Sequence, residues 1–357
     1  MISTRSSRAV WLVALALGIA IVVAVYGVAT IRFELNDDWL IEDVLSGRFT
    51  GTCQAHVIFL HIWLGQALAW LYCTFPSVEW YVVCLLLCHV LAVAGLALVV
   101  LDRKAPRQYV WLVFVVLAVV FIVPKNLVLT YTTAAGLTAA SGMFLVLEAL
   151  REPGISRGHL AFGLFCLFVA CLVRAQAFAL IVVLALPWLV RYALKGRATA
   201  TGITLLLILA IGGSLSWIHK HEYQSDAEWS EALQYNRARA AIHDSDSVRS
   251  QMTAGGEIVD DALRQAGWTR NDSRLFFAWV FYDKSLYSLE SLRKIRARLG
   301  PSMTEGMLDI GSWIALAKQG FWAVAGLLRE KGILIQILLC LAIPALSLRN
   351  RAAAWWS

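Results

Sequence analysis

Apolar runs of about one membrane thickness recur along this chain and restrict what it can fold into. Of all residues, 59% are hydrophobic and 15% are charged, whereas soluble domains average about 45–50% apolar and about 25% charged. This composition excludes an ordinary soluble enzyme, a disordered protein and a disulfide-rich secreted module. Because the runs are long and do not alternate every second residue, they predict an all-α, polytopic transmembrane protein rather than a β-barrel.

About eight of these runs are expected to cross the membrane. They are residues 9–31, 80–101, 109–123, 127–150, 160–173, 175–190, 199–218 and 332–348. Basic residues cluster at 102–107, 151–157, 191–197 and 349–351, and Lys and Arg favour the cytoplasmic side of a membrane. All four basic loops become cytoplasmic if the N-terminus is cytoplasmic and the apolar run 57–75 stays at the outer face as an interfacial helix. Whether residues 313–328 also cross is left open.

This threading divides the chain into three parts. Residues 1–218 form a membrane core with a first outer loop at 32–79, residues 219–329 form an extracytoplasmic helical domain, and residues 330–357 hold the last span and the C-terminal tail. Within the outer domain, helical spacing covers residues 227–242, 248–266 and 289–299, with turns expected at Gly255-Gly256, Gly267 and Gly300-Pro301. The net charge of +7 is attributed to cytoplasmic Lys and Arg, and not to nucleic-acid binding.

The first outer loop carries the densest group of carboxylates in the membrane core. Its members are Glu34, Asp37, Asp38, Glu42 and Asp43. Adjacent carboxylates repel one another, so either one is protonated or a cation neutralises them. Such a group can supply a general base or a divalent-metal site at Asp37 and Asp38. The alternative is a solvated loop in which Asn36 or Asp37 caps the helix that follows.

Two cations fall on the same outer face in this threading. Arg174 stands between the runs 160–173 and 175–190, and Lys125 follows Pro124. An Arg between two membrane spans is costly unless an acidic group or a ligand pairs with it. Its guanidinium matches the geometry of phosphate oxygens. These residues therefore predict a site for a phosphate-bearing ligand, whereas the alternatives are an ion pair with the first-loop acids or a snorkelling side chain. His56 lies near the same surface.

Other polar residues carry weaker signals. His89, in mid-span, is expected to form a hydrogen bond between helices. Cys53 and Cys73 flank a segment placed outside, where a disulfide can form, and none of the seven cysteines makes a Cys-x-x-Cys pair. Residues 235–239 and 268–272 mix aromatic, amide and charged side chains, which suits contacts with sugars or polyanions but also describes an ordinary helix surface.

The order of these features resembles the opening of the GT-C membrane glycosyltransferases, which include the protein O-mannosyltransferases and the bacterial lipid A aminoarabinose transferases. A first span is followed by paired acids at Asp37 and Asp38, then by His-x-x-Phe and Leu-Gly from His56 to Gly65. The family often has Asp-Glu where this chain has Asp-Asp, and Pro and Lys before the interfacial helix. The chain is also similar to uncharacterised bacterial polytopic proteins with Asn-Asp-Asp-Trp in the first loop. The resemblance covers about residues 9–218.

The resemblance implies an inverting transferase in the bacterial cytoplasmic membrane. The donor would be a sugar on a polyprenyl phosphate, and the acceptor a glycan, lipid or protein of the cell envelope. Asp37 or Asp38 would act as the general base, while Arg174, Lys125 and His56 would bind substrate and the lipid phosphate. Some family members use a divalent metal such as Mg²⁺ or Mn²⁺. A transporter or flippase for a charged lipid or glycan, and a non-catalytic membrane scaffold, are the alternative functions.

Overall fold

A computed structural model describes residues 8–30, 32–33, 36–101, 115, 128–151 and 156–299. The described chain is helical apart from two short strands and the connecting loops. It divides into two compact units, Met1–Glu222 and Tyr223–Ser357. The predicted spans 109–123 and 332–348, the segment 313–328 and Lys125 lie outside the described residues, so those predictions stay open.

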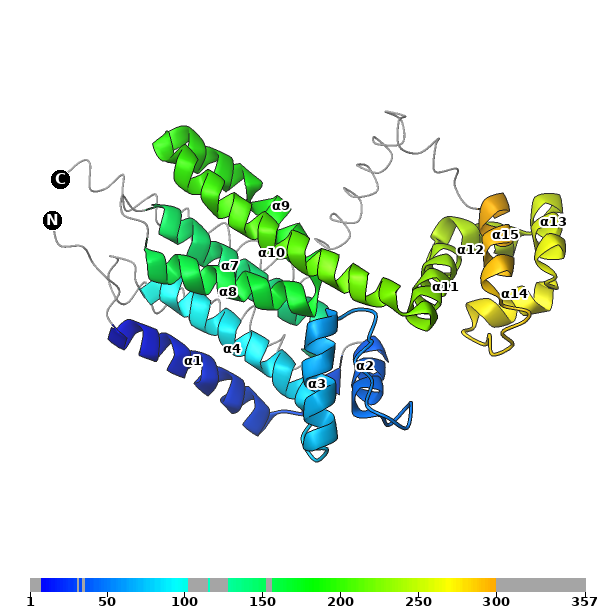
Figure 1. Ribbon diagram of the computed structural model, residues 1–357, viewed down its shortest axis with the longest axis horizontal. Coiled ribbons are helices and arrows are strands. Elements are labelled where there is room, and N and C mark those ends of the chain that lie inside the picture. The colour runs from blue at the N-terminus through cyan, green and yellow to red at the C-terminus, as the bar shows by residue number, and fades with distance from the viewer. Residues whose placement is uncertain are drawn as a thin grey trace. The chain divides into compact units, whose positions relative to one another are not determined.

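The first unit holds the apolar helices, which Figure 1 shows in blue to green. In chain order its elements are α1 (Arg8–Val28), β1 (Arg32–Phe33), α2 (Asn36–Ser46), α3 (Ile62–Thr74), α4 (Trp80–Leu101), β2 (Val128–Leu129), α7 (Tyr131–Arg151), α8 (Arg157–Val173), α9 (Ala175–Tyr192), the π-helical turn η2 (Ala193–Arg197) and α10 (Ala198–Ser225). α1 packs on α4, α4 packs on α7, and α7 packs on both α8 and α9.

Four helical stretches are long and apolar enough to cross a membrane. They are Arg8–Val28, Trp80–Leu101, Tyr131–Arg151 and Ala175–Ser225. The last stretch has non-helical backbone at Lys195 and Gly196, where Gly196 has φ 82°. A Cβ added to Gly212 of α10 would lie 2.8 Å from the Phe178 ring of α9, so the chain folds back at Gly196 and the stretch is a helical hairpin. These helices indicate a membrane protein.

Small residues let neighbouring helices approach closely in this unit. A Cβ on Gly142 of α7 would lie 2.7 Å from the Gly163 carbonyl oxygen of α8, and the reverse substitution would meet the Gly142 carbonyl oxygen at the same distance. Close approach through small residues is the usual way in which helices associate within a bilayer, where lipid is as apolar as the side chains. The α7–α8 contact is therefore built by its glycines.

The structure changes two of the predicted apolar segments. The run 57–75 is helical only from Ile62 to Thr74, and 13 residues rise about 20 Å, less than the hydrocarbon core of about 30 Å. The run 127–150 was predicted to begin as a helix, but Val128 and Leu129 form a strand that pairs in parallel with Arg32 and Phe33. This two-stranded ladder fastens the end of α1 to the start of α7.

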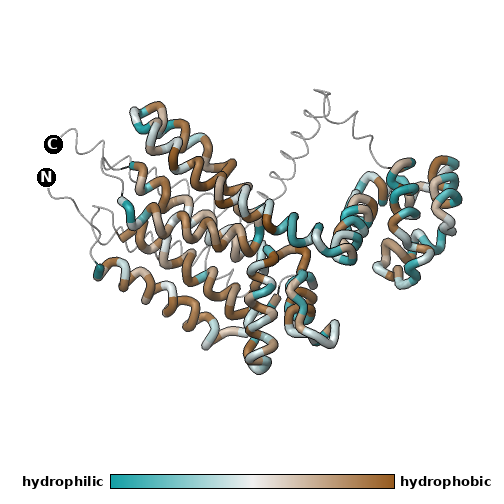
Figure 2. The backbone as a smooth tube through the Cα atoms, viewed as in Figure 1, coloured by the Kyte–Doolittle hydropathy of each residue, from teal (hydrophilic) through white to brown (hydrophobic). Residues whose placement is uncertain are grey.

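The second unit is a set of short helices that mix hydrophilic and hydrophobic residues, as the hydropathy colouring of Figure 2 shows. The helices are α11 (Ala227–His243), α12 (Asp246–Ala254), α13 (Glu257–Ala266), α14 (Arg270–Phe277) and α15 (Leu289–Leu299). The core is formed by buried side chains that include Ile242, Trp268, Phe276, Tyr287 and Leu292.

Helix starts in this unit follow ordinary capping chemistry. Asp226 and Ser245 cap α11 and α12, and Thr269 forms a reciprocal capping box with Asp272 at the start of α14. The turn expected at Gly255 and Gly256 is confirmed, because both residues adopt positive φ and separate α12 from α13. Helix α14 was not predicted from the sequence.

Candidate functional site

Asp38 is the carboxylate that joins three elements of the first unit. It lies in the first turn of α2 and its residue is fully buried. Its Oδ1 accepts a hydrogen bond from the Tyr81 hydroxyl of α4 at 2.7 Å and another from the Tyr131 backbone N–H, at the start of α7, at 2.9 Å. Burial raises the pKa of Asp38, and these two hydrogen bonds partly oppose that shift. Asp38 therefore anchors the acidic loop to the membrane helices.

Asp37 differs from its neighbour in exposure and in partners. It is half-buried, and it makes no hydrogen bond or ion pair with any residue that the structure describes. It also lies inside the first turn of α2 rather than at the residue before the helix, so the structure does not support the alternative in which Asp37 caps the helix. A carboxylate is favoured at this end of a helix by the positive end of the helix dipole. Of the two aspartates, Asp37 is the one that a ligand can reach.

Arg174 stands at the sharp junction between α8 and α9, where its backbone is extended. Its guanidinium carbon lies 4.9 Å from the centre of the Tyr131 ring and 5.1 Å from the centre of the Phe59 ring. The two rings stack with centres 5.4 Å apart and an interplanar angle of 17°. Cation–π contacts hold a guanidinium without using its N–H donors.

No ion pair joins Arg174 to a described carboxylate. The alternative in which Arg174 pairs with the first-loop acids is therefore not seen among the described residues, where two aromatic rings contact the guanidinium instead. Arg174, Asp37 and Asp38 all lie within electrostatic range of the Tyr131 hydroxyl. The structure thus gathers a cation, an accessible carboxylate and a buried carboxylate around Tyr131. Sequence reasoning missed Tyr131 and Tyr81, which stand at the starts of predicted spans with no motif to mark them.

Glu42 and Asp43, the last two carboxylates of the group, are neutralised within the loop. Arg48 pairs with Glu79 at 2.7 Å, with Glu42 at 3.2 Å and with Asp43 at 3.7 Å. Burial raises the pKa of Glu42 to about 8, and its contact with Glu79 adds to that shift. The pKa of Glu79 is lowered, first by its hydrogen bond with Glu42 and then by Arg48. The cluster therefore contains both of the solutions to carboxylate repulsion, a cation and a retained proton.

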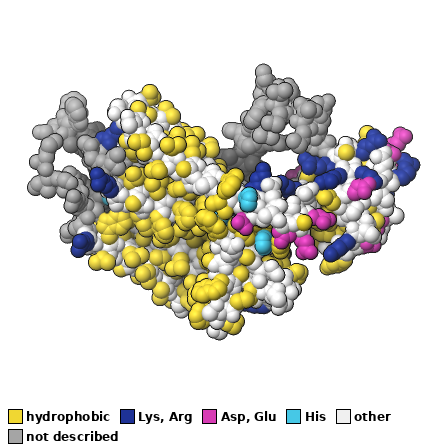
Figure 3. Space-filling model, in the orientation of Figure 1, with side chains coloured by type: hydrophobic (Ala, Val, Ile, Leu, Met, Phe, Trp, Pro, Cys, Tyr) yellow, Lys and Arg dark blue, Asp and Glu magenta, His cyan; other side chains and the backbone are white. Residues whose placement is uncertain are grey.

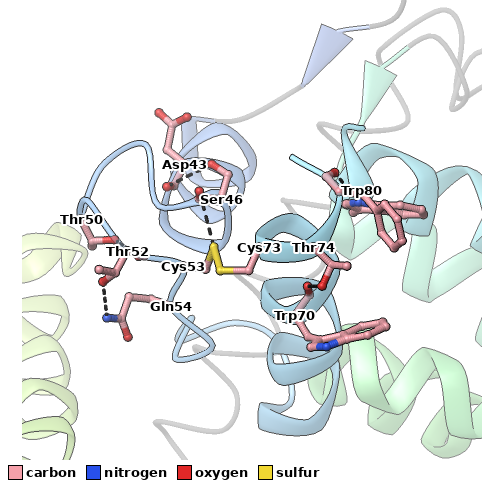
Figure 4. Close-up of a disulfide and its surroundings, with 11 residues drawn as sticks. Asp43, Ser46, Thr50, Thr52, Cys53, Gln54, Trp70, Cys73, Thr74 and Trp80 are labelled. Carbon is pink, nitrogen blue, oxygen red and sulfur yellow. Dashed lines mark hydrogen bonds between the residues drawn. A yellow bond between two sulfur atoms is a disulfide. The ribbon is translucent and has the colours of Figure 1, made fainter. Parts of the chain in front are cut away.

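A disulfide braces the same loop, as Figure 4 shows. Cys53, in the connection after α2, is bonded to Cys73 in α3, with the Cα atoms 6.2 Å apart. This disulfide was an open alternative from the sequence, and the structure forms it. A glycine packs the other end of α3 against the connection, because a Cβ on Gly65 would collide with the Ala55 carbonyl oxygen. Both contacts hold the segment that carries His56 and Phe59.

Histidines gather at the start of α3 rather than beside Asp37. His61 caps the helix, with Nδ1 accepting from the Trp63 N–H at 3.2 Å and Nε2 donating to the Leu215 carbonyl at 2.8 Å. Its ring centre lies 5.5 Å from that of His219, which accepts from the Ile62 N–H. Burial lowers the pKa of His61, so the ring is neutral, as this donor–acceptor pattern requires. His56 is half-buried and within electrostatic range of His219.

The remaining predictions for this site have mixed outcomes. His89 was expected to bond to another helix, but its Nδ1 bonds to the Leu85 carbonyl of its own helix at 2.9 Å. Among the described residues, no three His, Cys, Asp or Glu side chains are arranged to hold a metal ion. On the face seen in Figure 3, hydrophobic side chains cover the first unit, whereas Lys, Arg, Asp and Glu gather over the second.

Comparisons of the chain with protein-family models, with curated proteins and with solved structures found no match. The function is therefore inferred from the geometry around Tyr131.

Proposed function

We propose that the protein is a membrane glycosyltransferase that moves a sugar from a polyprenyl phosphate to a hydroxyl of an envelope acceptor. One observation carries the proposal. Asp38 holds the Tyr131 backbone, the Tyr131 ring contacts the Arg174 guanidinium, which pairs with no described carboxylate, and Asp37 next to Asp38 is accessible. An accessible base and a free anion-binding cation close to one residue are the two groups that transfer from a lipid phosphate needs.

In the proposed step, Asp37 accepts the proton of the acceptor hydroxyl. The hydroxyl oxygen then bonds to the anomeric carbon, while the bond from that carbon to the phosphate oxygen breaks with inversion. The electron pair leaves on the phosphate oxygen, so the second product is the polyprenyl phosphate. Arg174 stabilises the developing charge of this leaving group with its N–H donors, which no described residue occupies.

Asp38 has a positioning role in this proposal. Its residue is fully buried and its Oδ1 already accepts two hydrogen bonds, so it does not contact the acceptor. It fixes the first turn of α2 and thereby sets where Asp37 points. Phe59 and Tyr131 position Arg174 in the same way, through the two faces that they offer to the guanidinium.

The proposed membrane side is the outer leaflet of a bacterial cytoplasmic membrane. The Cys53–Cys73 disulfide supports this placement, because disulfides persist in oxidising compartments and are rare in the cytoplasm. The cytoplasm would then face the basic turn η2 with Lys195 and Arg197, as the positive-inside rule favours. The second unit, which begins at Tyr223, would lie outside and is proposed to bind the acceptor.

The test is sugar transfer in reconstituted vesicles. Radiolabelled sugars on polyprenyl phosphates are supplied with membrane acceptors to the wild type and to Asp37→Asn, Asp38→Asn and Arg174→Ala proteins of verified fold. Glu148→Gln is the matched control, since Glu148 pairs with Arg151 near the far end of α7 from Tyr131. Transfer by the wild type and the control that collapses in Asp37→Asn supports the proposal. Equal transfer by all variants, or none by the wild type with any donor, favours a transporter or a scaffold.

A further inference from the structure

Trp279, in the second unit, is held in an unusual backbone conformation. It is the non-glycine residue with positive φ, 62°, among those described. A Schellman motif at the end of α14 fixes it there, because the Trp279 N–H donates to the Phe276 carbonyl at 3.1 Å and the Val280 N–H donates to the Leu275 carbonyl at 2.8 Å. A bulky residue rarely adopts this conformation, which is costly unless the surroundings impose it. The backbone therefore directs this indole to one fixed place.

One face of the indole is covered by polar side chains. The His243 ring centre lies 4.1 Å from the Trp279 ring centre, and the Arg239 guanidinium carbon lies 4.8 Å from it. Both supporting groups are themselves fixed. Asn236 Oδ1 accepts two hydrogen bonds from Arg239, and Asp244 Oδ1 lies 3.0 Å from His243 Nδ1. The side chains of Arg239 and His243 are only 13% and 4% exposed.

The rest of the indole is open. Trp279 is 56% exposed, and its indole N–H donates to no described residue, whereas the buried Trp268 of the same unit donates to the Leu286 carbonyl at 2.8 Å. Asp244 lies at the edge of the platform with a side chain 55% exposed. Arg249, on the neighbouring helix α12, is exposed as well, and its guanidinium donates to the His243 carbonyl at 3.0 Å.

We propose that Trp279 is a platform for a pyranose ring of a glycan. A rigid indole with one open face offers its negative π-surface to the polarised C–H groups of a sugar ring. The indole N–H and the Asp244 carboxylate, which contacts the supporting Arg239 and His243 side chains, offer a donor and an acceptor of the kind that sugar hydroxyls need. Fixing these groups in advance reduces the entropy that binding costs.

The chemistry of the rim favours a sugar over a lipid surface. Trp and Tyr are common at membrane interfaces, and Tyr282 of the same loop is 88% exposed. However, the Asp244 carboxylate beside the ring would repel anionic headgroups. A polar network of amide, guanidinium, imidazole and carboxylate beneath the ring also has no use in an apolar anchor. This proposal does not rest on the proposed transfer reaction.

The test is binding of the full-length protein, in phosphatidylcholine nanodiscs, to immobilised manno-, gluco- and galacto-hexaoses. The expected result is saturable binding of at least one sugar by the wild type. Trp279→Gly should weaken it about tenfold or more, the loss expected for one aromatic stacking contact, and it keeps the fold because glycine accepts positive φ. Trp279→Phe should retain most of the affinity, and Tyr282→Ala is the exposed aromatic control.

Three further results decide the outcome. The Asp37→Asn protein should bind sugars as the wild type does, which separates this site from the transfer reaction. Wild-type affinity in Trp279→Gly, or no binding of any hexaose by the wild type, overturns the proposal. Quenching of a fluorophore on Tyr282→Cys by nitroxide-labelled lipids, beyond that of the unsubstituted protein, would assign the loop to the membrane surface and overturn it as well.

Discussion

The Tyr81 hydroxyl and the Asp38 carboxylate, 43 residues apart in the sequence, are joined by a buried hydrogen bond of 2.7 Å. Tyr81 also receives support from α3, because its backbone N–H donates to the Tyr72 hydroxyl at 2.9 Å. One chain of contacts thus runs from α3 through α4 to α2. It sets the position of the first-loop acids against the membrane helices.

Tyr81→Phe should destabilise the protein by about 1–3 kcal/mol, because it leaves a buried carboxylate oxygen with one partner fewer. It should also raise the pKa of Asp38 further, since the Tyr81 hydrogen bond lowers it. Chemical denaturation in detergent measures the first effect. The control is Tyr282→Phe, which changes an exposed hydroxyl. Equal stability of Tyr81→Phe and the wild type would show that the bond is not formed.

The Phe59–Tyr131 stack should matter for transfer more than for folding. Phe59→Leu removes one of the two rings against Arg174, so the guanidinium loses part of its support and the leaving phosphate is stabilised less well. We expect transfer to fall by about 10–100-fold, comparable to the loss of one positioned charge contact. Steady-state transfer rates measure it. Arg174→Lys should show a similar loss, because an ammonium keeps the charge but lacks the planar fork.

Glu42 should make the stability of the first unit depend on pH. Burial and Glu79 raise its pKa to about 8. The folded protein therefore keeps the Glu42 proton at pH values between the ordinary pKa of a glutamate and about 8, whereas the unfolded chain has already lost it there. The stabilisation is present below about pH 4.5 and is lost as the pH rises toward 8.

Glu42→Gln keeps the neutral form at every pH and should flatten this decline. Melting temperatures from pH 4.5 to pH 8.5 measure the slope. This range runs from the ordinary pKa of a glutamate, about 4.5, to beyond the raised pKa of Glu42, about 8. Asp261→Asn, in an exposed pair with Arg264 in the second unit, is the control. An unchanged slope in Glu42→Gln would rule out a retained proton.

The Cys53–Cys73 bond predicts which side of the membrane the first loop faces. After reduction of intact spheroplasts, a membrane-impermeant maleimide should label the wild type and fail to label a Cys53→Ser, Cys73→Ser double variant, because the free cysteines among the described residues lie in helices α4 and α8. The double variant should also lose about 2–4 kcal/mol of stability. Labelling of the wild type only after lysis would place the loop in the cytoplasm.

Sequence patterns predicted the helical membrane class but not the contacts between elements that build the site. Apolar length identifies a span such as 80–101, since hydrocarbon thickness sets that length. The same criterion could not place the start of α7, because Val128 and Leu129 are apolar and their strand exists only through pairing with Arg32 and Phe33. The break between α12 and α13 was predictable, because the Gly255-Gly256 pair marks a turn and both residues adopt positive φ.

The site residues were predicted by charge, and their partners were not. Arg174 stands out because an ionised group between two apolar runs is costly, and Asp38 because it belongs to the densest group of carboxylates in the membrane core. Tyr81, Tyr131 and Phe59 are common residues for such segments, and only the folded chain shows that they hold those charges. For this reason the alternative of an ion pair between Arg174 and the loop acids is not seen among the described residues. Arg48, a loop residue that the sequence analysis passed over, takes Glu42 and Asp43 instead.

The most direct test of the account compares Asp37 with Arg174 in a single turnover. Each variant is loaded with labelled sugar on polyprenyl phosphate, and both donor binding and the rate of transfer are measured. We predict that Asp37→Asn binds the donor as the wild type does but transfers at least about a hundredfold more slowly, while Arg174→Gln also loses donor affinity. Transfer by Asp37→Asn at the wild-type rate would contradict the account.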